Sequence, residues 1–386
     1  MTGRSPPITL NNGVTMPVLG LGTLHRRAPA RTADTVACAI DHGYRLIDTA
    51  ASYANERQVG EGIVRSGLAR AELFVTTKLW ISDYGDERAL RACDASLRRL
   101  GLDYVDLYLL HWPVPSDFAA TVVSYRAAET LLAEGRVRAI GVCNHSAQHL
   151  ENLIARTDVV PAVHQVELHP FFIQRELREA HARHGMVTQS WSPLGGVNVH
   201  APADPHTVRN PLAHPVIVAL ATKYGKTPAQ VVLRWHIDHG LSAIPKSVRP
   251  ARIAENIDIF DFVLSADDIA SIDAMDTGVR GGPDPEIVDT TLFTWTIEDE
   301  ASRPIWRRRA PAMDERVERD ADGLAASLST SPGRPRMTTW STDARRKIAE
   351  ANDLHIAPCR EDEATYGTST WMWSVAVDYA RRPCLT

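Results

Sequence analysis

The feature that most constrains the fold is a regular alternation of short apolar runs with longer amphipathic segments, from about Pro17 to Asp276. Because these runs are continuously apolar rather than alternating, both faces of the predicted sheet are covered, which is typical of parallel strands. The eight strand-like runs are Val18–Gly20, Leu46–Asp48, Leu73–Lys78, Val105–His111, Ala139–Cys143, Val163–Glu167, Val187–Ser192 and Ser242–Pro245.

The intervening segments predict helices with recognisable ends. Ser146 is a predicted N-cap, and Thr227 to Gln230 form a predicted capping box with proline in the first helical position. Among the predicted helices are Thr32–His42, Glu87–Leu100, Tyr125–Glu134, Ala147–Ala155 and Arg175–His184, and the glycines that separate a helix from the next strand are Gly43, Gly101, Gly135, Gly185 and Gly240.

Eight strand–helix units in about 260 residues predict an α/β protein with a (β/α)8 TIM barrel. An open doubly wound sheet is the alternative. Such a sheet normally opens with a glycine-rich phosphate turn, and Gly20-Leu21-Gly22 lacks the third glycine of that turn. The closed barrel is therefore favoured.

Composition excludes several classes of protein. The 386 residues carry 42 Lys and Arg against 47 Asp and Glu, a formal charge of −5, so nothing favours nucleic acid or an anionic membrane as partner. No apolar run is long enough to span a bilayer, and Met1–Leu10 lacks the pattern of a secretory signal. The five cysteines contain no CxxC pair, which argues against a disulfide framework or a zinc site and indicates a cytoplasmic protein without metal.

The character of the chain changes after Asp289. We expect a barrel over residues 1–289 and a poorly ordered linker over 290–336, rich in Arg, Asp, Ala, Ser and Pro. Acidic residues dilute the basic run Arg307–Arg309, so a linker is favoured there over a nucleic-acid patch. Residues 337–386 suggest one helix and one strand, too little for a core, and are interpreted as a partial domain added by gene fusion or read-through.

Four polar residues stand at or just beyond the predicted strand ends: Asp48, Tyr53, Lys78 and His111. Each alone has an ordinary structural explanation, but barrel enzymes carry their catalytic groups at this end of the strands. An ammonium near a phenol stabilises its phenolate, a carboxylate holds that ammonium, and an imidazole can donate to a carbonyl oxygen. The set suits proton transfer to a developing alkoxide, and the hydride must come from a bound cofactor.

Four stretches resemble the aldo-keto reductases in order and spacing: Asp48–Glu56, Val75–Trp80, Leu109–Pro113 and Ile244–Val248. Two others, Ala254–Phe262 and Trp191–Gly195, are most similar to the bacterial 2,5-diketo-D-gluconate reductase branch. The resemblance implies an NADPH-dependent oxidoreductase of alcohol-dehydrogenase type. It would reduce aldehydes or ketones, including sugar keto acids such as 2,5-diketo-D-gluconate, to alcohols, with tyrosine as the general acid.

Position by position, the resemblance implies a catalytic set of Asp48, Tyr53, Lys78 and His111, and a substrate site of Trp80, His111 and Trp112. The implied cofactor residues are Gly22, Thr23, Asp48, Cys143, Asn144, Gln165, Trp191, Ser192, Leu194, Lys246, Ser247, Val248, Arg249, Arg252, Glu255 and Asn256. The cations among residues 246–252 precede a predicted helix and suit the 2′-phosphate, which favours NADPH over NADH. We expect a monomer acting on a small carbonyl compound. A non-catalytic NADPH-binding regulatory module and a barrel impaired by its C-terminal extension are the alternatives.

Overall fold

The computed structural model describes residues 5–24, 31–195 and 210–297. All of them belong to the first of two units of the chain, Met1–Arg303. The expected partial domain at 337–386, and all of the expected linker beyond residue 297, lie outside the described residues.

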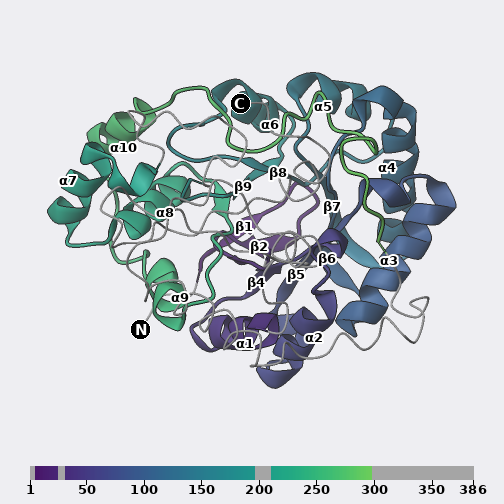
Figure 1. Cartoon of the computed structure of the whole chain (residues 1–386), viewed down its shortest axis with the longest axis horizontal. Coiled ribbons are helices and arrows are strands. Elements are labelled where there is room, and N and C mark those ends of the chain that lie inside the picture. The colour runs from purple at the N-terminus through teal and green to yellow at the C-terminus, as the bar shows by residue number, and fades with distance from the viewer. Residues whose placement is uncertain (1–4, 25–30, 196–209, 298–386) are drawn as a thin grey trace, which may run out of the picture. The chain divides into compact units, whose positions relative to one another are not determined.

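Eight parallel strands form one sheet at the centre of the molecule (Figure 1), as the sequence predicts. Every pair of neighbours in the sheet is consecutive in the chain, which is the order that a (β/α)8 barrel requires. The strands are β3 (Leu21–Gly22), β4 (Leu46–Asp48), β5 (Phe74–Leu79), β6 (Val105–Leu110), β7 (Val137–Cys143), β8 (Val163–Glu167), β9 (Val187–Trp191) and β10 (Ser242–Ala243).

The first and last strands close the barrel. Leu19 forms a parallel bridge with Ala243, whose carbonyl accepts from Gly20 N at 2.9 Å and whose amide donates to Val18 O at 2.8 Å. An antiparallel hairpin, β1 (Pro7–Thr9) and β2 (Thr15–Pro17), precedes the barrel and buries Met16 among the residues of its interior.

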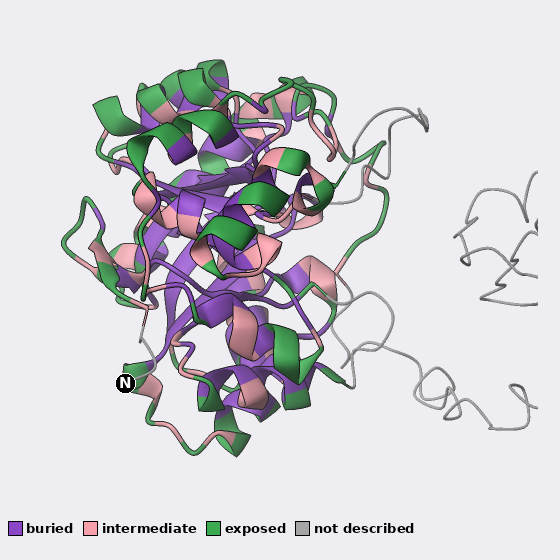
Figure 2. Cartoon of the chain, turned by 90° about the vertical axis from the view of Figure 1, so that its left-hand side faces the viewer, coloured by how far each residue is buried: buried purple, intermediate pink, exposed green. Residues whose placement is uncertain are grey.

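Helices surround the sheet, and Figure 2 shows their exposed faces turned outward from the buried strands. Six helices alternate with β3 to β9, and α8 and α9 complete the ring, while α7 and α10 are additional. Their bounds are α1 (Thr32–Asp41), α2 (Glu56–Arg65), α3 (Asp86–Leu100), α4 (Phe118–Ala133), α5 (Ala147–Ile154), α6 (Arg175–Arg183), α7 (Pro215–Tyr224), α8 (Pro228–Asp238), α9 (Pro250–Ile257) and α10 (Ala266–Asp273).

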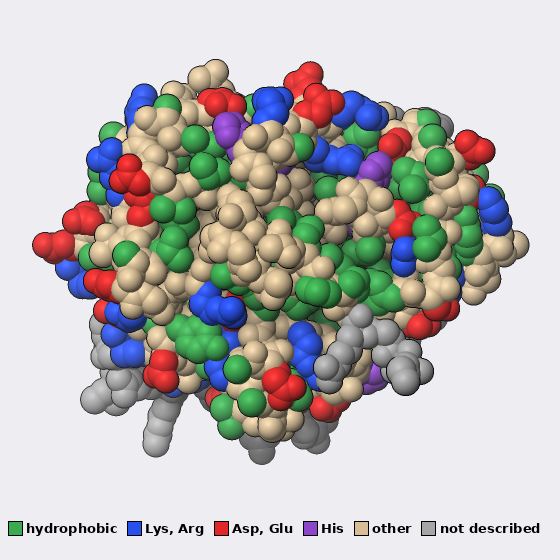
Figure 3. All heavy atoms as spheres, turned by 180° about the vertical axis from the view of Figure 1, so that it is seen from behind, with side chains coloured by type: hydrophobic (Ala, Val, Ile, Leu, Met, Phe, Trp, Pro, Cys, Tyr) green, Lys and Arg blue, Asp and Glu red, His purple; other side chains and the backbone are tan. Residues whose placement is uncertain are grey.

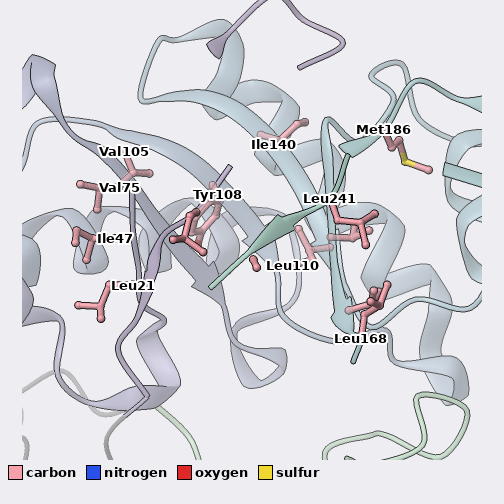
Figure 4. Packing of buried hydrophobic residues seen from close by; sticks show 14 of the residues in the cluster. Leu21, Ile47, Val75, Val105, Tyr108, Leu110, Ile140, Leu168, Met186 and Leu241 are labelled. Carbon is pink, nitrogen blue, oxygen red and sulfur yellow. The ribbon is translucent and has the colours of Figure 1, made fainter. Parts of the chain in front are cut away.

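The core has two layers, which explains the continuous apolar runs. In β6, Leu107 and Leu109 pack inside the barrel, whereas Tyr108 and Leu110 pack between the sheet and the helices. Figure 4 shows this outer layer, with Tyr108 and Leu110 among the labelled side chains. Since successive side chains of a strand point to opposite faces, both faces must be apolar.

Several boundaries differ from the prediction. The first strand begins at Leu21 rather than Val18, because only Leu19 of the earlier segment pairs, and it does so with Ala243. The helix α4 begins at Phe118 rather than Tyr125, capped by the Asp117 carboxylate, which accepts from Ala120 N. The predicted caps at Ser146 and Thr227 are confirmed. The five predicted helix-ending glycines all have positive φ.

Candidate active site

The centre of the site is a buried ion pair at the carboxyl ends of two neighbouring strands. Asp48 ends β4 and Lys78 lies near the end of β5, and Nζ of Lys78 is 2.5 Å from Oδ1 of Asp48. The ammonium also donates to the carbonyl of Thr49 at 2.9 Å. Burial is the largest single influence and opposes the charge of Lys78, but Asp48, with weaker contributions from Tyr53 and Cys143, raises the pKa of the ammonium above its ordinary value.

Tyr53 brings its hydroxyl to this pair. It ends a 3₁₀ turn, Ala51–Tyr53, directly after β4, and its hydroxyl is 3.4 Å from Nζ of Lys78. Burial raises the pKa of the phenol to about 12, while the ammonium acts in the opposite direction. The phenol is therefore protonated at neutral pH and is able to act as an acid toward a group beside it.

His111 follows β6 and completes the set. Its ring meets the ring of Tyr53 edge-on at 5.7 Å between centroids, and Nδ1 is 3.3 Å from Oγ of Ser52. Burial, and secondarily the charge of Lys78, lowers the pKa of His111 well below its ordinary value. The imidazole is thus neutral and offers one N–H donor.

A directional hydrogen-bond network extends the site across the barrel. Gln165, on β8, donates from Nε2 to Oδ2 of Asp48 and to Oε1 of Gln189, both at 2.7 Å. Gln189 in turn donates to Oγ of Ser242 at 3.1 Å. The second oxygen of Asp48 is therefore held by an amide whose own orientation is set by β9 and β10.

The buried Asn144 and the half-buried Trp191 form a second arrangement beside the first. Asn144 has a left-handed φ of 58°, donates from Nδ2 to the carbonyl of His111 at 3.0 Å, and accepts the indole N–H of Trp191 at 2.8 Å. Ser192 has a left-handed φ of 48°, Leu194 is half-buried, and Cys143 is a buried free thiol. These residues adjoin one another at the ends of β7 and β9.

The segment after β10 carries the predicted phosphate-binding cations. Lys246, Arg249 and Arg252 are exposed and form no ion pair with any described residue. Arg249 occupies the N-cap of α9 without a side-chain cap, and the first helical residue, Pro250, has no N–H. The amides of Arg252 and Ile253 both donate to the carbonyl of Arg249 at 3.0 Å, so an anion here would be held mainly by the cationic side chains. Ser247 and Asn256 are buried, and Val248 is half-buried.

Three other predicted cofactor positions have local structural roles. The half-buried Glu255 accepts from Oγ1 of Thr227 at 2.7 Å. Thr23 donates from both N and Oγ1 to the carbonyl of Asp48, at 2.9 Å each. A Cβ on Gly22 would lie 2.9 Å from the carbonyl oxygen of Ile244, so glycine permits the close approach of β3 to the segment after β10.

Aromatic side chains gather at the rim beside His111. The Trp80 ring meets His111 edge-on at 5.2 Å and stacks on Trp295 at 4.8 Å. Phe293 lies 5.4 Å from Trp80 and 5.6 Å from Trp112. The carbonyl of Trp295 accepts the indole N–H of Trp80 at 3.0 Å.

Sequence reasoning did not single out several residues of this site. Ser52, in the turn after β4, and Gln189, in the middle of β9, contact predicted residues directly, and the available signal was a polar residue in or just after an apolar strand. Phe293 and Trp295 fall in the expected linker, and only their aromatic character distinguished them. Glu167 ends β8 as Asp48 ends β4, a signal that could have drawn attention to it.

The surface charge, the helices and the clusters of potential metal ligands can be compared with the sequence predictions. Figure 3 shows charged side chains of both signs scattered mainly round the edge of one face, with hydrophobic ones nearer its centre. Within the described residues, no helix is long and apolar enough to cross a membrane, and no group of three potential ligands is arranged to hold a metal ion.

Comparison with known proteins defines the class. A family model for the aldo/keto reductase family matches residues 18–277. The chain is 58% identical over 294 residues to a morphine 6-dehydrogenase of Pseudomonas putida, which covers 76% of this chain and 99% of that protein.

Two solved structures share the fold. The aldo/keto reductase of Brucella melitensis is 46% identical with a TM-score of 0.65, over 70% of this chain and 100% of that one. A Bombyx mori aldo-keto reductase in complex with NADP is 34% identical with a TM-score of 0.67, over 76% of this chain and 97% of that one. The chain described here belongs to the aldo/keto reductase family.

Proposed function

We propose that this protein reduces aldehydes and ketones to alcohols with NADPH, and oxidises the alcohols in the reverse direction. The observation that carries the proposal is a buried phenol 3.4 Å from a buried ammonium, beside a neutral imidazole. A pure binding module has no need of that arrangement, so the non-catalytic alternative is not favoured.

The residues present fit a dinucleotide with a 2′-phosphate. Lys246, Arg249 and Arg252 supply three exposed cations at the start of α9, none of them in an ion pair with a described side chain, which suits a phosphate dianion. Asn144 and Gln165 would hold the carboxamide, and Trp191 would lie against the nicotinamide ring. When bound, NADPH supplies the hydride.

Tyr53 acts as the general acid in reduction. It gives its proton to the carbonyl oxygen of the substrate, and the phenolate that remains is stabilised by Lys78. At 3.4 Å and an effective dielectric constant of about 20, the attraction between these two charges is about 5 kcal/mol. Asp48 keeps Lys78 charged and in place, since it raises the pKa of the ammonium.

His111 orients the substrate. We assign Nδ1, 3.3 Å from Oγ of Ser52, as the acceptor of the serine hydroxyl, which places the proton of the neutral ring on Nε2 for donation to the carbonyl oxygen. A neutral imidazole polarises the oxygen without competing with Tyr53 as an acid.

The mechanism predicts that Tyr53→Phe abolishes turnover and leaves the Kd for NADPH almost unchanged, because only the proton donor is lost. Turnover of a small aldehyde and NADPH binding by fluorescence titration test this. Tyr125→Phe is the matched control, since Tyr125 is fully buried in α4, away from the strand ends. Near-normal turnover by Tyr53→Phe would overturn the mechanism.

The cofactor assignment predicts that Arg252→Ala raises the Kd for NADPH far more than the Kd for NADH, because only NADPH carries the 2′-phosphate. Titration of the variant with both cofactors measures the ratio. An equal rise for both would argue against the assignment of Arg252 to the phosphate.

For the substrate we propose a carbonyl compound that carries a flat apolar ring system. Aromatic rings at positions 80, 112, 293 and 295 line the rim beside His111, and they suit stacking against such a molecule. The relative from Pseudomonas putida is named for a polycyclic alcohol. The resemblance of Ala254–Phe262 to the diketogluconate reductase branch supports a second candidate, a sugar keto acid.

A panel of a diketogluconate, methylglyoxal, a nitrobenzaldehyde and a bicyclic aromatic ketone separates these candidates by kcat/KM. A clear preference for the diketogluconate would refute the aromatic assignment.

We further propose that the protein acts as a cytoplasmic monomer. The division into barrel, linker and partial domain also stays a prediction. Trp295, inside the expected linker, still contacts the barrel through its hydrogen bond with Trp80.

A further inference from the structure

We propose that Glu167 is a positioning residue, whose carboxylate fastens the C-terminal segment 276–297 to the barrel and so fixes the indole of Trp191. We call residues 276–297 the strap. In Figure 1 the strap runs in green from α10 past α6 and α5 toward α3. The inference rests on the proposed function, in which Trp191 lies against the nicotinamide.

Glu167 ends β8, and both of its carboxylate oxygens accept hydrogen bonds from the strap. Oε1 accepts from Gly281 N at 2.7 Å, and Oε2 accepts from Gly282 N at 2.8 Å. His169 holds the carboxylate from the other side, with Nε2 at 3.0 Å from Oε1. Burial alone would raise the pKa of Glu167, but the bonds from His169, Gly282 and Gly281 outweigh it and lower the pKa. The anion is therefore the form that holds the strap at neutral pH.

The strap at this point lies directly against Trp191. A Cβ on Gly282 would come within 2.5 Å of Cη2 of Trp191 and 3.1 Å of Oε2 of Glu167. At the other end of the same indole, Nε1 donates to Oδ1 of Asn144 at 2.8 Å. The ring is thus held at both ends, by a hydrogen bond at one and by the glycine backbone at the other.

The strap has other attachments on both sides of Gly281 and Gly282, among them Arg280, whose guanidinium lies over the Phe172 ring at 5.3 Å. Thr277 donates from N and Oγ1 to the carbonyl of Phe171, at 3.1 and 2.8 Å, where the strap begins. Val288 is fully buried, and the Trp295 carbonyl meets Trp80 near the far end. Among the described side chains, Glu167 alone accepts hydrogen bonds from the backbone of Gly281 and Gly282.

The chemistry of the side chain matters because the two glycine amides donate to different oxygens of the carboxylate, Gly281 N to Oε1 and Gly282 N to Oε2. A carboxylate offers two oxygens, whereas a glutamine offers one oxygen and an NH2 group that would face a second donor. In Glu167→Gln one glycine amide loses its acceptor, so the strap is held less firmly against Trp191. Gly282→Ala disturbs the same indole directly, through the added Cβ.

The test measures both variants in the full chain, with Glu129→Gln as matched control. Glu129, on α4, also accepts two successive backbone amides, those of Asp158 and Val159, both at 2.7 Å, but both donate to Oε1. A glutamine keeps one oxygen, so Glu129→Gln can retain both bonds, whereas Glu167→Gln cannot. The readouts are kcat and KM with a small aldehyde, the Kd for NADPH, the deuterium isotope effect with 4-deuterated NADPH, and hydrogen exchange of residues 278–288.

We expect kcat to fall roughly tenfold in Glu167→Gln and Gly282→Ala, with a larger isotope effect, because the hydride step is misaligned. The Kd for NADPH should change by less than about threefold, since the cations at 246–252 still hold the phosphate. Exchange of 278–288 should rise in Glu167→Gln. Glu129→Gln should leave kcat and this exchange unchanged.

An active wild-type chain with unchanged kcat in both variants would overturn the positioning role. Unchanged exchange of 278–288 in Glu167→Gln would overturn the attachment itself, and this outcome does not depend on activity. A wild-type chain that reduced no carbonyl would instead refute the proposed function. Recovery of kcat in Glu167→Asp, which keeps two oxygens, would support the proposal.

Discussion

Replacing Asp48 by Asn removes the anion beside Lys78 while it keeps the size of the side chain. In the wild type, Oδ1 is 2.5 Å from the ammonium and Oδ2 accepts from Gln165 at 2.7 Å, with all three groups buried. An asparagine has one acceptor for these two donors. Its NH2 group would face Nε2 of Gln165, whose reversal is opposed by its bond to Gln189.

The loss of folding stability in Asp48→Asn has an upper bound, which is set by the free energy of deprotonating Lys78. Removing one partner of a buried ion pair costs about 3–5 kcal/mol because it leaves an uncompensated charge. Lys78 can lose its proton in the folded state, which removes the uncompensated charge. With an ordinary pKa of about 10.4, deprotonation at pH 7 costs about 1.36 × 3.4 ≈ 4.6 kcal/mol, which bounds the loss from the charge.

The loss should shrink as the pH rises. In the wild type Asp48 raises the pKa of Lys78, so folded and unfolded lysine are both protonated between pH 7 and 9. In Asp48→Asn burial lowers the folded pKa, so the unfolded state binds more protons and stability increases with pH. At pH 9 the ceiling is about 1.36 × 1.4 ≈ 1.9 kcal/mol, so up to about 2.7 kcal/mol is regained.

Urea unfolding at pH 7, 8 and 9 measures this dependence, with Asp106→Asn as the control. Asp106 is also a fully buried carboxylate, but its partners are Arg70 and Arg138, both at 2.6 Å. Arginine keeps its proton throughout this range, so the control loses stability without gaining a pH slope. A loss below about 1 kcal/mol at pH 7, or one that is equal at pH 7 and 9, would refute the reasoning about Lys78.

Two further substitutions test a helix cap and the aromatic rim of the site. Thr227→Ala removes the side-chain cap that accepts from Gln230 N, and it should cost about 1 kcal/mol in urea unfolding; no change would mean that the cap is not formed. Trp295→Ala removes the ring stacked at 4.8 Å on Trp80, which should raise KM for a bicyclic aromatic ketone severalfold and leave KM for methylglyoxal nearly unchanged. An equal rise for both substrates would contradict stacking as the basis of selectivity.

The strands were predictable because burial on both faces leaves an unbroken apolar run, as in Val105–Leu110. Pairing was less predictable. The run Val18–Gly20 is apolar, yet only Leu19 bridges a strand, because apolar character reports burial and not the partner of each amide. The start of α4 was missed since its first two turns contain Thr121, Val122 and Val123, which have low helix propensity, and Asp117 supplies the cap.

The convergence of Asp48, Tyr53, Lys78 and His111 was predictable from topology, because the carboxyl ends of parallel strands meet on one rim. Their electrostatic states were not. The pKa of Tyr53 depends on the balance between burial and the charge of Lys78, and that balance depends on a distance of 3.4 Å. No spacing along the chain determines that distance.

The contacts of the strap with the barrel could not be predicted from the sequence, for a physical reason. Gly281-Gly282 is typical of a flexible turn, but in the structure the two amides donate to Glu167, 114 and 115 positions away, and Gly282 leaves no room for a Cβ beside Trp191. Trp295 likewise meets Trp80 across 215 positions. The groups proposed for the chemistry follow from the strand ends, which topology fixes, whereas the proposed selectivity depends on contacts that only the folded path of the C-terminal segment creates. Substitutions on the strap should therefore change the choice of substrate and the alignment of the cofactor before they change the proton-transfer machinery.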